Sequence, residues 1–79
     1  MRGGVSAARA ESAALVRAAR GYASMSRDDL ARRVGLNRSA LLRLESGYMP
    51  LDSDLAGRLA SVTGVPSWFL RDGFEGRPS

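Results

Sequence analysis

Apolar residues recur every three or four positions along this chain, and short segments rich in glycine and polar residues separate the apolar runs. Such spacing is typical of amphipathic helices, and the alternation typical of half-buried strands does not occur. Five runs fit the pattern, and we expect helices over about residues 7–23, 26–34, 37–46, 52–63 and from about 66 onward. The pattern therefore predicts an all-α fold, a compact five-helix bundle.

The segments between the runs carry residues that begin and end helices. Ser26 and Asn37 are good N-cap residues, because their side-chain oxygens accept hydrogen bonds from free backbone N–H groups of the first turn. Asp52 or Ser53 can cap the fourth helix in the same way. Three helices should end at glycines, which readily adopt the left-handed conformation found at helix C-termini. These glycines are Gly35, Gly47 and Gly64.

A turn of about three residues, which contains Gly35, separates the second and third predicted helices. Two short helices joined in this way cross at a steep angle. The third helix, about 10–12 Å across, would then project from the domain and match a DNA major groove about 12 Å wide. We expect apolar residues of both helices to hold the crossing angle, namely Leu30, Ala31, Val34, Leu36, Leu41 and Leu44.

Positive charge is concentrated in the same part of the chain. All twelve basic residues are arginines, and eight acidic residues leave a formal net charge of +4. Residues 15–46 hold seven arginines and three acidic residues, whereas residues 47–79 hold three arginines and four acidic residues. Arginine presents a fork of donors that fits phosphates and guanine edges. The charge pattern therefore indicates that the middle of the chain binds an anionic partner such as DNA.

The composition argues against catalysis. The chain has no cysteine and no histidine, so it lacks the usual ligands of a protein zinc site and the commonest general base. Its serines consequently have no base that would activate a nucleophile. We expect neither an enzyme nor a metal site nor a cofactor.

Segment lengths set the expected domain organisation and location. No apolar stretch approaches the roughly 20 residues that span a bilayer, and residues 1–10 lack the apolar segment of a secretory signal. We therefore expect a cytoplasmic protein with no membrane partner. The predicted helices form one domain over residues 7–72, preceded by a flexible arm over residues 1–6. Residues 73–79, rich in glycine and proline, predict a disordered tail.

The spacing of several residues in the second and third predicted helices resembles that of the phage repressor and Cro-like (XRE) family of helix-turn-helix regulators. These residues are Leu30-Ala31, Gly35, Asn37, Leu41 and Leu44-Glu45-x-Gly47. The resemblance covers roughly residues 12–72 and implies a lambda-repressor-like DNA-binding domain. It further implies a small transcriptional regulator, a repressor, that binds double-stranded DNA sequence-specifically with its third helix in the major groove.

The same resemblance implies which side chains contact bases. Arg38 and Ser39, at the start of the third helix, would reach base edges, with Arg43 one turn further along. Exposed positions of this helix are commonly polar in the family, yet Ala40 and Leu42 stand among them here. Leu42 fits either a contact with a thymine methyl group or a contact with a protein.

Other side chains are expected to contact the DNA backbone or to support the fold. By resemblance, Arg27 would contact a phosphate, although the family usually has glutamine at this position. Arg20 and Glu45 would form a salt bridge that ties the first helix to the third. Further candidates for phosphate contacts are Asn37, Arg32 and Arg33. The last two fit a solvated surface equally well.

A second class of function uses the same scaffold as a protein-interaction module. An antitoxin, an anti-repressor or a polymerase-contacting factor would be of this kind. Leu42 and the Tyr48-Met49 pair favour it, because they are apolar residues near the expected DNA-reading surface.

The aromatic pair Trp68-Phe69 in the fifth predicted helix has two interpretations. Most simply, the two rings complete a small core, since aromatic side chains bury large apolar areas. They are also the candidate contacts of a homodimer. A twofold interface would add stability to a domain of this size and would set the distance between two DNA half-sites.

Overall fold

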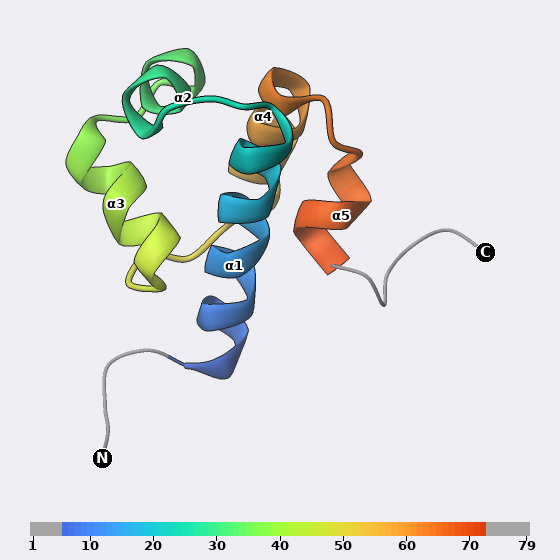
Figure 1. Cartoon of the computed structure of the whole chain (residues 1–79). Helices are drawn as coiled ribbons and strands as arrows, with labels where there is room; N and C mark the ends of the chain where they lie inside the picture. Colours follow the sequence, from blue (N-terminus) through green and yellow to red (C-terminus); the bar gives the residue numbers. More distant parts are fainter. Residues whose placement is uncertain (1–5, 73–79) are drawn as a thin grey trace.

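Five α-helices follow one another in the computed structural model, which describes residues 6–72 (Figure 1). They are α1 (Ala7–Tyr22), α2 (Arg27–Val34), α3 (Arg38–Ser46), α4 (Ser53–Thr63) and α5 (Ser67–Asp72). No strand occurs in this range, so the predicted all-α fold is confirmed. Residues 1–5 of the expected arm and the expected tail over residues 73–79 lie outside the described residues. None of the described helices combines the length and the hydropathy needed to cross a membrane.

The first four helices begin at side chains that accept hydrogen bonds from backbone N–H groups three positions further on. The oxygen–nitrogen distances are 3.2, 3.1, 2.7 and 2.8 Å for Ser6, Ser26, Asn37 and Asp52. Ser6, the last residue of the expected arm, is thus in contact with the first turn of α1. Its hydroxyl caps α1, because the helix that starts at Ala7 leaves N–H groups of its first turn without a helical partner.

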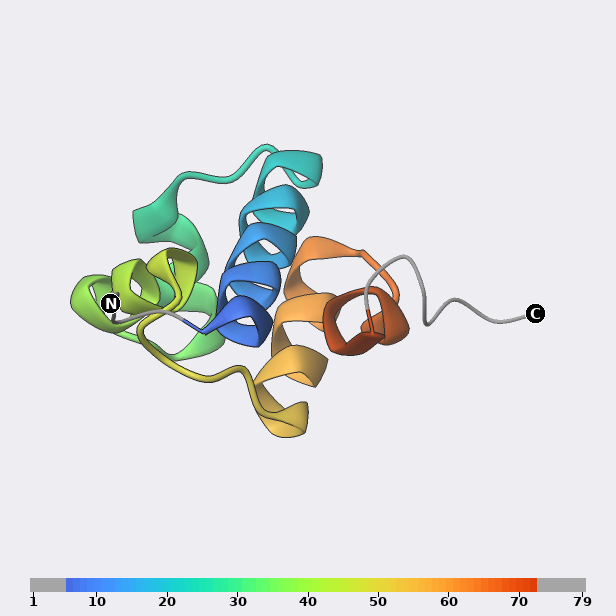
Figure 2. The same cartoon turned by 90° about the horizontal axis from the view of Figure 1, so that it is seen from below.

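The long helix α1 lies between α2 and α3 on one side and α4 and α5 on the other (Figures 1 and 2). It packs against α3, α4 and α5, while α2 packs against α3 and α4. Every helix contributes at least one fully buried side chain to a single core. The largest of these side chains are Val16, Leu30, Leu41, Leu44, Leu59 and Leu70.

The turn between α2 and α3 is closed by hydrogen bonds at the end of α2. The N–H of Leu36 donates to the carbonyl of Ala31 at 2.9 Å, and Gly35 adopts φ of 81°. This arrangement is the Schellman motif, which requires a residue in the left-handed conformation. Arg58 of α4 donates to the carbonyl of Val34 at 2.9 Å and so joins the turn to the rest of the domain. The steep α2–α3 crossing thus rests on the turn as well as on the core.

The left-handed conformation makes Gly35 sensitive to substitution. We expect Gly35→Ala to lower the free energy of unfolding by about 1–2 kcal/mol, because a β-carbon is strained at positive φ. Gly57→Ala is the matched control, since Gly57 lies inside α4 with open space around its α-carbon. It should raise the same free energy by about 0.5–1 kcal/mol. Chemical denaturation measures both, and changes of equal sign would contradict the role of Gly35.

Candidate nucleic-acid interface

The helix α3 has one buried and one exposed face and lies at the edge of the bundle (Figure 1). The buried residues are Ala40, Leu41, Leu44 and Glu45. The exposed residues are Arg38, Ser39, Leu42, Arg43 and Ser46. Because these five recur at spacings of three and four positions, they share one side of the helix. The side chains expected to contact bases are thus brought together on one surface.

Ala40 does not lie on this surface, contrary to the expectation from sequence. Ala40 is only 8% exposed, because it precedes Leu44 by four positions and so shares the face of α3 that packs on the core. Leu42, which is 47% exposed, is the apolar residue that remains on the outer side of α3.

The two arginines of the α3 surface differ in their surroundings. Arg38 approaches Asp28, from the first turn of α2, with its Nη1 3.3 Å from each carboxylate oxygen. Both side chains are well exposed, at 69% and 62%. Arg43 forms no ion pair within residues 6–72. Its guanidinium therefore keeps all five donors for a partner outside the described residues.

The remaining candidates for phosphate contacts occupy α2 and the start of α3. Arg32 and Arg33 are exposed, and both pair with the carboxylate of Asp29, at 2.5 and 3.2 Å. The side-chain oxygen of Asn37 accepts the N–H of Ala40 and so caps α3. The structure thus gives each of these three residues a local partner.

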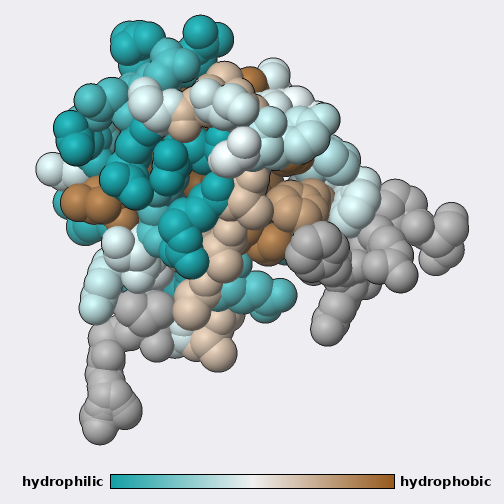
Figure 3. All heavy atoms as spheres, in the orientation of Figure 1, coloured by the Kyte–Doolittle hydropathy of each residue, from teal (hydrophilic) through white to brown (hydrophobic). Residues whose placement is uncertain are grey.

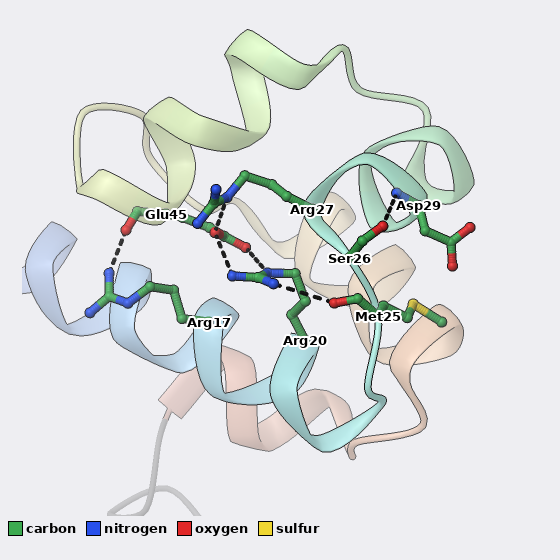
Figure 4. A network of polar contacts seen from close by, with 7 residues as sticks. All are labelled: Arg17, Arg20, Met25, Ser26, Arg27, Asp29 and Glu45. Atoms are coloured by element: carbon green, nitrogen blue, oxygen red, sulfur yellow. Dashed lines mark hydrogen bonds and ion pairs between the residues drawn. The ribbon is translucent and has the colours of Figure 1, made fainter.

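A buried carboxylate joins α1, α2 and α3 (Figure 4). The side chain of Glu45 is only 2% exposed and accepts from two guanidinium groups. Arg20 donates from Nε to Oε2 at 2.8 Å and from Nη2 to Oε1 at 3.3 Å, which forms the salt bridge expected between these residues. Arg27 donates from Nε to Oε1 at 2.8 Å. Charge-assisted bonds of this kind are roughly twice as strong as neutral ones.

Arg27 therefore has a structural contact in addition to the phosphate contact implied by resemblance. Its Nε is used by Glu45, and 35% of its side chain remains exposed at the start of α2. A third arginine, Arg17, donates from Nη1 to the backbone carbonyl of Glu45. Three arginines, namely Arg17, Arg20 and Arg27, therefore surround the single carboxylate of Glu45, and the group has a net charge of +2.

Hydrophilic side chains gather over α2 and α3 in the surface view, and a hydrophobic area lies beside α5 (Figure 3). On α5, Trp68 and Phe69 meet edge to face, with ring centroids 6.3 Å apart. Both rings are half-buried. They help to line a pocket of about 340 Å³, together with Ala18, Tyr22, Gly64, Val65 and Pro66. The aromatic pair thus both packs against the domain and borders an open apolar surface.

Three residues of these sites were not identified from sequence. Asp28 and Arg17 enter the prediction from sequence only as charges among residues 15–46, and Tyr22 has no role in it. Arg17 precedes Arg20 by three positions, so the shared helix face was the available signal. The contact of Asp28 with Arg38 had no local signal, because it joins two helices.

Within residues 6–72, no group of three or more histidine, cysteine, aspartate or glutamate side chains is placed to hold a metal ion. Every buried side-chain nitrogen or oxygen in the same range has a hydrogen-bond partner. The buried polar groups described here thus stabilise the fold.

Comparison with known proteins gives one finding. A helix-turn-helix family model matches residues 16–67, which include the whole of α2, α3 and α4 and the C-terminal part of α1. Searches of curated proteins and of solved structures gave no match.

The burial of Glu45 predicts a large loss of stability when its carboxylate is removed. Breaking a buried ion pair typically costs about 3–5 kcal/mol, and a domain of ~60 residues has roughly 3–9 kcal/mol in all. We expect Glu45→Ala to be largely unfolded, as measured by thermal melting under circular dichroism. The control is Asp54→Ala, which removes an exposed i,i+4 pair with Arg58 and should cost under about 1 kcal/mol. Similar melting temperatures for both variants would contradict the role of Glu45.

Proposed function

Because the chain belongs to the Cro/repressor-like (XRE) family of helix-turn-helix DNA-binding regulators, we propose that it binds double-stranded DNA sequence-specifically, with α3 in the major groove. The observation that carries this proposal is the exposed face of α3. Two arginines, two serines and a leucine project from one side of a helix whose other side is fixed in the core. A rigid helix edge of this composition suits the reading of base edges.

The exposed residues of α3 offer chemistry for different bases. The forks of Arg38 and Arg43 match the O6 and N7 acceptors of guanine, and the methyl groups of Leu42 match the methyl group of thymine. Ser39 donates to or accepts from several bases. Arg38 and Arg43 are five residues apart, which is about 7.5 Å along a helix. This distance corresponds to about two base-pair steps of 3.4 Å, so the two arginines would read different base pairs.

Residues around α3 would hold the DNA backbone. Arg27 is the foremost candidate, since Glu45 fixes its Nε and its outer nitrogens remain on a 35% exposed side chain. Arg32 and Arg33 pair with Asp29 on the surface, and exposed pairs of this kind are worth only about 0–1 kcal/mol. They can therefore be exchanged for phosphate contacts. Asn37, at the N-terminus of α3, completes this set.

We further propose that the protein acts as a homodimer and represses transcription. Two copies related by a twofold axis would place two α3 helices about 34 Å apart, one turn of the DNA helix. The apolar surface formed by Trp68, Phe69 and Tyr22 is the candidate contact between the copies. A dimer that occupies the major groove competes with other proteins for the same base pairs, which is how it would repress.

One observation favours the second candidate function, a protein-interaction module. Leu42 on α3 is 47% exposed and Tyr48, just after α3, is 58% exposed. Large apolar side chains on a surface often mark contacts with other proteins. On this hypothesis the outer face of α3 binds a protein, and its arginines do not contribute to DNA binding.

The DNA-reading role of α3 is tested by its two arginines. We expect Arg38→Ala to weaken binding to the preferred duplex by about 1–3 kcal/mol and to relax the preference at one base pair. Arg43→Ala should do the same at a different base pair. The preferred duplex is selected from a random pool with the unchanged protein, and dissociation constants are measured by fluorescence anisotropy at physiological salt.

The control for the arginine variants is Arg71→Ala, which removes the same charge from α5. This helix packs on α1 and α4, so Arg71→Ala should lose little affinity and no base preference. An unchanged affinity in the Arg38→Ala, Arg43→Ala double variant would contradict the proposal. The protein-interaction function would then take its place.

The dimer is tested through an exposed residue, so that folding is not affected. Tyr22 is 71% exposed, and we expect Tyr22→Ser to shift the protein from dimer toward monomer in sedimentation equilibrium. Tyr48→Ser is the matched control, because Tyr48 is also exposed but does not line the apolar pocket. The dimer proposal fails if the unchanged protein sediments as a monomer both free and bound to DNA.

A further inference from the structure

The ion pair between Arg38 and Asp28 differs from the other exposed ion pairs of residues 6–72. Arg32 and Arg33 with Asp29, and Arg58 with Asp54, are pairs at i,i+3 or i,i+4 within one helix. Their partners are brought together by helical spacing alone. Asp28 instead reaches from α2 to the exposed face of α3, so this pair exists only because the two helices cross as they do.

The geometry of the contact leaves one edge of the guanidinium free. Arg38 donates to the carboxylate of Asp28 from Nη1, which lies 3.3 Å from both carboxylate oxygens. No other hydrogen bond of the Arg38 side chain is formed within the described part of the chain. Nε and Nη2 point to the other side of the planar group and form a two-donor fork. That fork fits the O6 and N7 of one guanine while Asp28 keeps hold of Nη1.

We propose that Asp28 is a specificity-determining residue that positions Arg38 for one base pair. The inference rests on the proposed function of α3. An arginine held in one direction loses less side-chain entropy when it binds, so the correct base pair gains affinity. The carboxylate also lies near the DNA backbone in this arrangement and is repelled by phosphates, which weakens binding wherever Arg38 finds no guanine. Asp28 thus raises the affinity for the preferred site and lowers the affinity for other sites.

The pair has no comparable role in stability. Both side chains are more than half exposed, and exposed ion pairs contribute little to folding. Neutralising Asp28 therefore changes DNA recognition without unfolding the domain. Asp28→Asn keeps the shape of the side chain and removes its charge. The matched control is Asp54→Asn, because Asp54 also lies in the first turn of a helix and also forms an exposed pair with an arginine.

The experiment compares Asp28→Asn, Arg38→Ala, the double variant and Asp54→Asn with the unchanged protein. Each is titrated against the selected duplex, the same duplex with the Arg38-dependent base pair changed, and a random duplex, at one salt concentration. We expect Asp28→Asn to bind the random duplex several-fold more tightly. Discrimination at the Arg38-dependent base pair is the ratio of the dissociation constants for the changed and the selected duplex. In Asp28→Asn this ratio should fall by about 3–10-fold, which is part of the discrimination that one bidentate contact carries. In the Arg38→Ala background, Asp28→Asn should change this discrimination by less than about twofold. Asp54→Asn should leave it unchanged.

Two results would overturn the inference while the proposed function stands. In the first, Asp28→Asn tightens all three duplexes by the same factor, so that Asp28 acts only as a charge. In the second, its effect on discrimination persists without Arg38, so that it does not act through that residue. A protein that selects no preferred duplex, or one whose discrimination does not depend on Arg38, would overturn the proposed function itself and the inference with it. Circular dichroism of Asp28→Asn should match that of the unchanged protein, which checks that the variant domain is folded.

Discussion

The buried carboxylate of Glu45 is the point on which the arrangement of the first three helices depends. It lies on the inner side of α3, and it accepts from Arg20 of α1 and Arg27 at the start of α2. The side chain of Glu45 is only 2% exposed, and transfer of a charged group from water to the interior costs several kcal/mol. Its negative charge must therefore be compensated by neighbouring groups. The two arginines can compensate it only when all three helices hold their positions. The carboxylate therefore makes the helix-turn-helix and α1 one rigid unit.

This constraint links the interior to the outer face of α3. A helix of nine residues has little stability by itself, so its direction is set by what its inner side contacts. Leu41 and Leu44 supply apolar contacts in the core, and Glu45 supplies directional ones. The neighbouring exposed residues, such as Leu42 and Arg43, lie on the same fixed helix backbone, which reduces the entropy they lose when they bind. Precise placement of the outer side of α3 thus begins with a buried ion pair.

Charge is distributed unevenly between structural and exposed roles. Arg17, Arg20 and Arg27 contact Glu45, and on α2 the carboxylate of Asp29 pairs with two exposed arginines. Arg43 forms no ion pair within residues 6–72. The high net charge seen in the sequence is therefore not one uniform field. It consists of three arginines around the buried Glu45, exposed pairs that are easily exchanged, and an exposed arginine that no described carboxylate neutralises.

The sequence by itself determined the helices and the turn between α2 and α3. Caps such as Ser26 and Asn37 contact groups three residues away, and Gly35 needs only its own φ, so local sequence is enough to place them. The periodicity of apolar residues likewise identified the side of α3 that carries Leu41 and Leu44. The family resemblance supplied the pairing of Arg20 with Glu45, which periodicity does not contain. These features follow from contacts that are short in the sequence or from a recurring pattern.

Tertiary structure alone decided the other contacts between charged groups of different helices. The contacts of Arg27 with Glu45 and of Arg38 with Asp28 join different helices, and their distances depend on crossing angles that no local pattern encodes. Helical spacing places Ala40 beside Leu44, but how far the packed face of α3 extends depends on the neighbouring elements, and these bury Ala40. Helix boundaries are set by backbone hydrogen bonds over three or four residues, whereas ion pairs between helices require positions correct to within an ångström or so. Local sequence therefore specifies the elements, and packing specifies the partners.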